Sequence, residues 1–180
     1  MTNGTMTFAI VALGFALAAC ATAVPPRPSL AYEDLATATF RTAFAASGVA
    51  TLSRGIYRER PVPEAATETI IRLDLPLATG DLNSDGDPDA VVVLISDPGG
   101  SGTFYELAAV VNDQGKPRHI ASTLLGDRVR VVSLSIHSGV IRATLLTHDP
   151  GDPALCSRKE DARSYRLDGD RLVQVWGATL

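Results

Sequence analysis

The stretch Ala90-Val91-Val92-Val93-Leu94-Ile95-Ser96 decides the fold, because six consecutive apolar side chains stand in it without interruption. Valine and isoleucine are β-branched and favour an extended backbone. An unbroken apolar run of this length is typical of a central strand that is covered on both faces. We therefore predict a sheet with protein on each side of Ala90 to Ser96.

Further β-rich runs lie on both sides of this stretch and are separated by short turn signals. The segment Asn112 to Lys116 is expected to be a tight turn, and Ser138-Gly139 and Asp168-Gly169 are hairpin signals. Strands joined this closely must be antiparallel, since a parallel pair needs a crossover of about a dozen residues. The other expected strands are Val49 to Tyr57, Glu68 to Leu77, Thr103 to Val111, His119 to Leu125, Arg128 to His137, Val140 to Thr147, Ala162 to Leu167 and Arg171 to Trp176.

These strands predict an all-β fold, either an antiparallel sandwich or a partly closed barrel. Residues Leu30 to Ala46 are compatible with two structures. Ser29 could cap a helix over the Ala-rich stretch that follows, whereas threonines at 37, 39 and 42 favour a strand. The segment His148 to Pro153 holds two prolines and a glycine, which predicts an exposed loop.

The N-terminal segment points to export. Met6 to Ala19 carries no charge and is too short to span the roughly 30 Å hydrocarbon core as a helix. It ends in Leu17-Ala18-Ala19-Cys20, which resembles the lipobox of bacterial lipoprotein signals. The resemblance implies that residues 1–19 are a signal peptide and that the Cys20 thiol carries a diacylglycerol. The alternative is an uncleaved helix with a chance cysteine, and the lack of Lys and Arg in Met1 to Thr5 leaves it open.

The lipobox divides the chain into three parts. After the signal peptide come a lipidated cysteine and a Pro-rich tether over residues 20–29, and then a single domain over residues 30–180. Ala21, in place of an aspartate, resembles the default signal for the outer membrane. We therefore expect a lipid-anchored protein of the bacterial cell envelope that faces the periplasm. Cys156 then remains as a lone thiol, which cannot form a disulfide within its own domain.

Composition excludes one class of partner. The net charge is −4, with both signs dispersed and no basic block. The chain therefore lacks the basic patch that is typical of nucleic-acid-binding proteins.

The stretch Asp81-Leu82-Asn83-Ser84-Asp85-Gly86-Asp87-Pro88-Asp89 is the sharpest chemical signal of the mature chain. Oxygen-bearing side chains stand at positions 1, 3, 5 and 9, and a glycine at position 6 permits a sharp turn. Calcium-binding loops place hard oxygen ligands at this spacing. The expected ligands are the side chains of Asp81, Asn83, Asp85 and Asp89, with the backbone carbonyl of Asp87.

An EF-hand would place a glutamate at position 12, where this chain has Val92. The loop instead resembles the DxNxDGxxD loops of integrin-type FG-GAP proteins, which lie between strands. The alternative is a metal-free turn, because Asp, Asn, Ser and Gly also form such turns. If calcium binds, a structural role is expected.

Catalytic signals are weak. Thr103 stands where a nucleophile elbow around Ser101 would need a glycine. The three histidines and Cys156 match no zinc spacing. We therefore predict no catalytic residue from the sequence.

From Gly80 onward several motifs resemble a family of exported bacterial proteins with no established activity, many of them lipoproteins. Members of that family often carry a Cys-Cys pair where this chain has Leu155-Cys156. The resemblance implies export and a β-rich fold. Its motifs are Gly80 to Asn83 with Asp85-Gly86 and Asp89 to Val91, Gly99 to Phe104, Leu107-Ala108 with Gly115 to Pro117, Leu125 to Val129, and Thr147-His148 with Asp152-Pro153.

Together these features predict a lipid-anchored envelope protein with a non-enzymatic binding or structural role and a calcium-stabilised loop. The alternative is a periplasmic hydrolase-like or inhibitor-like protein that acts on cell-wall material. That alternative requires His148, Asp149 and either Ser101 or Cys156 to meet at hydrogen-bond distance.

Overall fold

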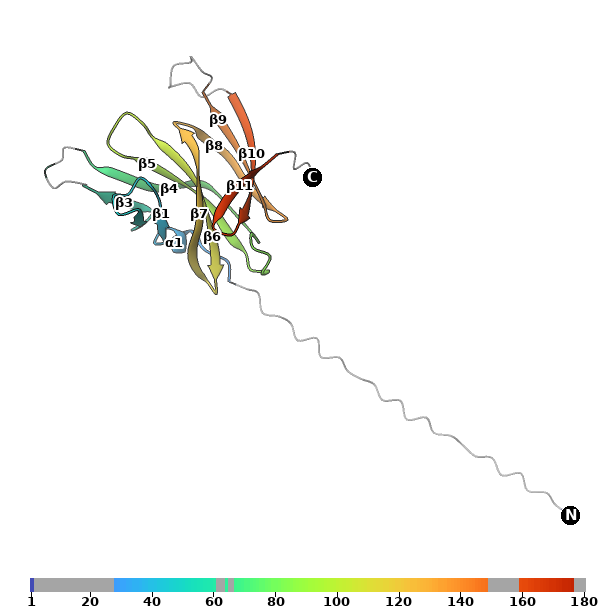
Figure 1. The fold of residues 1–180 in the computed structure, drawn as a ribbon. Coiled ribbons are helices and arrows are strands. Elements are labelled where there is room, and N and C mark those ends of the chain that lie inside the picture. The colour runs from blue at the N-terminus through green and yellow to red at the C-terminus, as the bar shows by residue number, and fades with distance from the viewer. Residues whose placement is uncertain (2–27, 61–63, 65–66, 149–158, 177–180) are drawn as a thin grey trace.

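The computed structural model describes residue 1 and residues 28–60, 64, 67–148 and 159–176. Within them the chain forms one short helix and eleven strands (Figure 1). The elements are α1 (Tyr32–Leu35), β1 (Thr39–Arg41), β2 (Val49–Thr51), β3 (Ile56–Glu59), β4 (Thr69–Gly80), β5 (Asp89–Asp97), β6 (Phe104–Asp113), β7 (Lys116–Asp127), β8 (Arg130–His137), β9 (Val140–Thr147), β10 (Lys159–Asp168) and β11 (Arg171–Val175).

All strand pairs are antiparallel. A five-stranded sheet has the order β3-β4-β5-β6-β7, and a four-stranded sheet has the order β11-β10-β9-β8. The β1–β2 hairpin forms a small third sheet. The predicted all-β antiparallel sandwich is therefore confirmed.

β5 lies at the centre of the larger sheet and is covered on both faces, as its apolar run predicts. Val91 and Val93 face the four-stranded sheet and belong to a core with Ile141 and Leu145 of β9. The alternate residues of β5 pack in a second core beneath α1, β1 and β2. In Figure 1 the β8–β11 sheet lies on one side of the central sheet, and α1 with β1 lies on the other. Leu94, like both valines, is fully buried.

The two large sheets approach each other closely where β4 passes β8. A Cβ atom added at Gly80 would lie 2.8 Å from the Cβ atom of Ile136. Since real Cβ atoms do not come so near, only glycine fits at this crossing. Gly80 is therefore a packing residue at the strand end that leads into the acidic loop.

The N-terminal region contains both of the structures that its sequence left open. A single helical turn, α1, is followed by the short strand β1. Ser29 is not the helix cap, because the N-cap residue is Ala31. The carboxylate of Asp34 accepts the Ala31 N–H at 2.9 Å and so closes the first turn.

Most strand bounds differ from the prediction by one to three residues, and one expected strand is divided. Val49 to Tyr57 is two strands, because Arg54 and Gly55 take positive φ angles of 51° and 79° and turn the chain between β2 and β3. The last hairpin turns at residues 169–170, one position later than expected. The charged run Lys159 to Asp161 begins β10.

Some predictions lie outside the described residues. These include the signal peptide after Met1, Cys20, Cys156 and residues 149–153 of the expected loop. In the described part of the chain, no helix reaches the length and apolar character that a membrane crossing requires.

Candidate functional site

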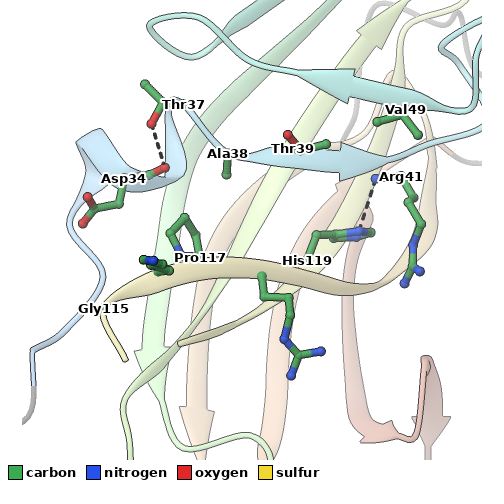
Figure 2. Close-up of a pocket in the computed structure, with 11 residues that line it drawn as sticks. Asp34, Thr37, Ala38, Thr39, Arg41, Val49, Gly115, Pro117 and His119 are labelled. Carbon is green, nitrogen blue, oxygen red and sulfur yellow. Dashed lines mark hydrogen bonds between the residues drawn. The ribbon is translucent and has the colours of Figure 1, made fainter. Parts of the chain in front are cut away.

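A groove runs between β1 and the free edge of β7. The backbone N–H of Arg41 donates to His119 Nδ1 at 3.2 Å, and Arg41 Nη2 donates to the carbonyl oxygen of Ile120. Figure 2 shows His119 and Pro117 pointing from β7 toward β1. A side-chain contact, rather than a strand ladder, therefore joins β1 to β7.

Three neighbouring hollows meet at this contact, and Arg41 and His119 line all three. The first has a volume of about 630 Å³ and extends along Thr39 toward Gly115 and Lys116. The second and third have volumes of about 500 and 480 Å³. Small-molecule sites fall in the range of about 300–1,000 Å³, so each hollow could hold a small ligand.

The His119 ring is neutral and fixed in one tautomer. Because Nδ1 accepts the Arg41 N–H, the ring proton is on Nε2, which donates to Ser122 Oγ at 2.9 Å. Burial, with a further contribution from the Arg41 charge, lowers the pKa of His119 to about 4. The ring also packs against Phe40, with centroids 5.5 Å apart. An imidazole that donates to a serine hydroxyl cannot take the proton of that hydroxyl.

The second hollow contains a buried carboxyl group. Glu106 of β6 is 7% exposed, and its Oε2 accepts the hydroxyl of the buried Thr42 at 2.6 Å. Burial raises the pKa of Glu106, and the Thr42 hydrogen bond opposes that shift in part. The exposed Asp170 lines the same hollow.

The first and third hollows carry positive charge. Arg118 lines both together with Arg41, and Lys116 lines the first. Each of the two hollows also has one acid in its lining, Asp34 in the first and Asp170 in the third, so the positive charge is in excess. All three basic side chains belong to exposed residues. Within residues 28–60, 64, 67–148 and 159–176, no carboxylate lies at ion-pair distance from these three cations.

The acidic loop is closed by hydrogen bonds between its own residues. Asp81 accepts the backbone N–H groups of Ser84 and Gly86 at 2.6 and 3.0 Å. Asn83 Oδ1 accepts the Asp85 N–H at 3.0 Å, and Asn83 Nδ2 donates to Asp85 Oδ2 at 2.7 Å. Positive φ angles at Ser84 and Gly86, 65° and 83°, give the loop its tight path.

Asp89, the ninth residue of the loop, lies in the interior. Its side chain is fully buried, and its two oxygens accept the N–H groups of Leu82 and Asn112, each at 2.9 Å. Burial raises the pKa of Asp89, and these two donors oppose the shift. Asn112 Nδ2 in turn donates to the carbonyl oxygens of Pro28 at 2.6 Å and Pro88 at 3.2 Å. Asp89 and Asn112 therefore join the acidic loop, the end of β6 and the last tether residues.

The donor set of the loop suits calcium in part. Asp81, Asn83 and Asp85 offer hard oxygens on exposed or partly exposed residues, as calcium prefers. Asp89 already satisfies two backbone donors, and the Asp87 N–H donates to Asp85 Oδ1 at 2.8 Å. Among the described residues, no three acidic, histidine or cysteine side chains are gathered into a metal-holding group. A cation would have to replace the hydrogen bond between Asn83 and Asp85.

The residues required by the hydrolase alternative are only partly described. His148 Nε2 lies 2.9 Å from the carbonyl oxygen of Arg128, and Ser101 is exposed in the loop before β6. Asp149 and Cys156 lie outside the described residues.

The sequence signals for the groove were faint. Glu106 is the one acidic residue in the run from Thr103 to Val111, and that break in an apolar strand marks a buried carboxylate. Nothing local in the sequence marks Arg41 or Arg118, because their roles depend on strands that are far apart in the chain.

None of the protein-family models, curated proteins and solved structures compared with this chain matches it significantly. The function of the chain is therefore inferred from the groove, the acidic loop and the N-terminal signal.

Proposed function

We propose that this chain is a lipid-anchored protein of the bacterial cell envelope, and that its sandwich domain binds a small ligand or a partner without catalysing a reaction. Leu17-Ala18-Ala19-Cys20 supports the anchor. The groove at β1 and β7 is the proposed binding site.

One observation carries this proposal, namely where the tether meets the domain. The Pro28 carbonyl is held by Asn112, and a Cβ atom at Gly115 would lie 3.6 Å from the Pro28 ring. Gly115 also lines the first hollow of the groove. Seven residues lie between Cys20 and Pro28, and an extended Pro-rich chain reaches about 25 Å over these eight residue steps. The lipid would thus hold the end of the domain that carries the first hollow of the groove near the membrane.

The protonation of His119 favours binding over hydrolysis. Ser122 and His119 are at hydrogen-bond distance, which a nucleophile and its base require. Here the imidazole donates to the hydroxyl, and its pKa of about 4 makes it a poor base near neutral pH. The pair is suited to orient a ligand rather than to activate the serine.

The anchor is tested by Cys20→Ser expressed in a bacterial host. We expect the parent chain in the membrane fraction and the variant in the soluble fraction, because the serine hydroxyl cannot take the thioether-linked lipid. Mass spectrometry of the N-terminal peptide should show acyl chains on the parent only. Cys156→Ser is the matched control and should remain in the membrane. A Cys20→Ser chain that also remains would contradict the anchor.

We also propose that calcium stabilises the acidic loop, with Asp81, Asn83 and Asp85 as its side-chain ligands. Calcium would offset repulsion between carboxylates that Asn83 only partly relieves. Millimolar calcium is expected to raise Tm by a few degrees, which corresponds to about 1 kcal/mol, and chelator should reverse the change. Asp85→Ala should abolish the response, whereas Asp113→Ala, an exposed residue outside the loop, should keep it. An unchanged Tm in the parent chain would rule the calcium site out.

A further inference from the structure

The hollows around Arg41 and His119 differ in charge. The first is lined by Arg41, Lys116 and Arg118 and by one acid, Asp34. The second is lined by Glu106 and Asp170, with Arg41 as its one basic side chain. We propose that this groove binds a small ligand with a carboxylate or phosphate on one side and a hydroxyl or amino group on the other. This assignment rests on the binding role proposed above.

The Arg41 side chain is already oriented to bind the anionic group of the ligand. Its backbone is fixed by the His119 ring, and its Nη2 is fixed by the Ile120 carbonyl. A guanidinium has five N–H donors, so most of them remain for a ligand. Because the side chain is already oriented, less conformational entropy is lost when an anion binds.

Arg118 supplies the second positive group. It lines the first and third hollows together with Arg41, so both arginines border the same space. His119, which also lines both hollows, is neutral near neutral pH and adds no charge of its own. Two arginines beside a groove of this size favour a carboxylate or phosphate, both of which match the fork of a guanidinium.

Glu106 and Thr42 are suited to the other side of the ligand. Thr42 already donates to Glu106 Oε2, so the free lone pairs of the carboxylate can accept from a ligand hydroxyl or amine. The carboxyl group is almost fully buried, and a ligand ammonium would compensate its charge. Ser122 and Asp170 line the same hollow and extend its polar surface.

The competing explanation is purely structural. Arg41 could serve only to cover the free edge of β7, since such edges otherwise invite pairing with another chain. Arg118 separates the two explanations, because it belongs to β7 itself and its side chain forms no hydrogen bond or ion pair within the described part of the chain that would cover the edge as the Arg41–Ile120 hydrogen bond does. Its replacement should affect binding and leave stability unchanged.

The test is an NMR titration of the full chain in detergent micelles with three ligands. They are the dipeptide alanyl-alanine, the same dipeptide acetylated at its amine and amidated at its carboxylate, and inorganic phosphate. We expect saturable shifts at Arg41 and along Lys116–Ser122 with the free dipeptide, weaker shifts with phosphate, and none with the blocked dipeptide. Arg41→Gln and Arg118→Gln should each lower the affinity for the free dipeptide and for phosphate at least about tenfold.

Two controls complete the experiment. Arg130→Gln removes an exposed arginine of β8 that lines none of the three hollows, and it should bind like the parent. Glu106→Gln should weaken the dipeptide and leave phosphate unaffected.

The proposal is overturned if the blocked dipeptide binds as tightly as the free one, if Arg118→Gln binds like Arg130→Gln, or if neither active ligand saturates. Unchanged dipeptide binding by Glu106→Gln would overturn the assignment of the second hollow. Membrane fractionation of the same variants reports on the anchor alone, because no groove substitution alters Cys20. Failure of the ligand assignment is thus distinguishable from failure of the anchor.

Discussion

Replacing Asp89 by alanine is expected to lower the free energy of unfolding by about 2–6 kcal/mol. The carboxylate accepts the N–H groups of Leu82 and Asn112, and all three residues are buried. A buried donor left without an acceptor costs about 1–3 kcal/mol, and alanine would leave two. Because Asn112 also holds Pro28 and Pro88, we expect the loss to spread to the tether end and the acidic loop.

Urea unfolding followed by circular dichroism measures this effect, and the pH dependence gives a second test. Burial raises the pKa of Asp89 above its ordinary value of 3.8, so the folded state keeps the proton to a higher pH than the unfolded state. The contribution of Asp89 therefore grows as pH falls toward 3.8 and declines as pH rises through the folded pKa. The difference in the free energy of unfolding between the parent and Asp89→Ala should therefore be larger close to pH 3.8 than at neutral pH.

Asp113→Ala is the matched control, because Asp113 is an exposed aspartate at the end of the same strand as Asn112. Asp113→Ala should change the free energy of unfolding by no more than about 0.5 kcal/mol. If Asp89→Ala also lies within that range, the two buried hydrogen bonds do not carry the stability assigned to them.

Replacing Phe40 by alanine is expected to cost about 3–5 kcal/mol, the range for truncating a buried aromatic side chain. Phe40 is fully buried in the core beneath the β1–β2 hairpin, and its ring lies against His119. β1 has only three residues, and Phe40 is the one buried residue among them. The groove should be lost with it, because Arg41 follows Phe40 directly.

Hydrogen exchange measures where this loss falls. Amides of β1 and β2 in Phe40→Ala should exchange faster than those of β9, whose buried residues belong to the other core. Phe40→Leu is the conservative control and should cost about 1–2 kcal/mol with the groove intact. Uniform loss of protection across both sheets would show that the hairpin and the sandwich unfold as one unit.

The sheet could be predicted because its signals are local. Ala90 to Ser96 predicts a strand buried on both faces, and Val140 to Thr147 was placed at its observed bounds. Errors occurred where local signals were weak or mixed. The segment Val49 to Tyr57 has a β-rich composition throughout, yet the positive φ of Arg54 and Gly55 divides it into two strands.

The acidic loop was also predicted as a unit, but the sequence treated its aspartates alike. Asp81 and Asp85 remain at the surface of the loop, whereas Asp89 starts β5 and is fully buried. Spacing alone could not separate these environments, because burial of Asp89 depends on Asn112 from a distant strand.

The sequence by itself determined the antiparallel strands, the buried central strand, the tight turns and the acidic loop, since each depends on neighbours along the chain. Only the tertiary structure decided the groove. In β7 the extra residue Ile120 forms a bulge, because Ala109 pairs with Ala121 while Val110 pairs with His119. Three residues apart, His119 and Ser122 would otherwise point to opposite faces of a strand. The bulge brings them to the face covered by β1, and alternation in sequence does not reveal it.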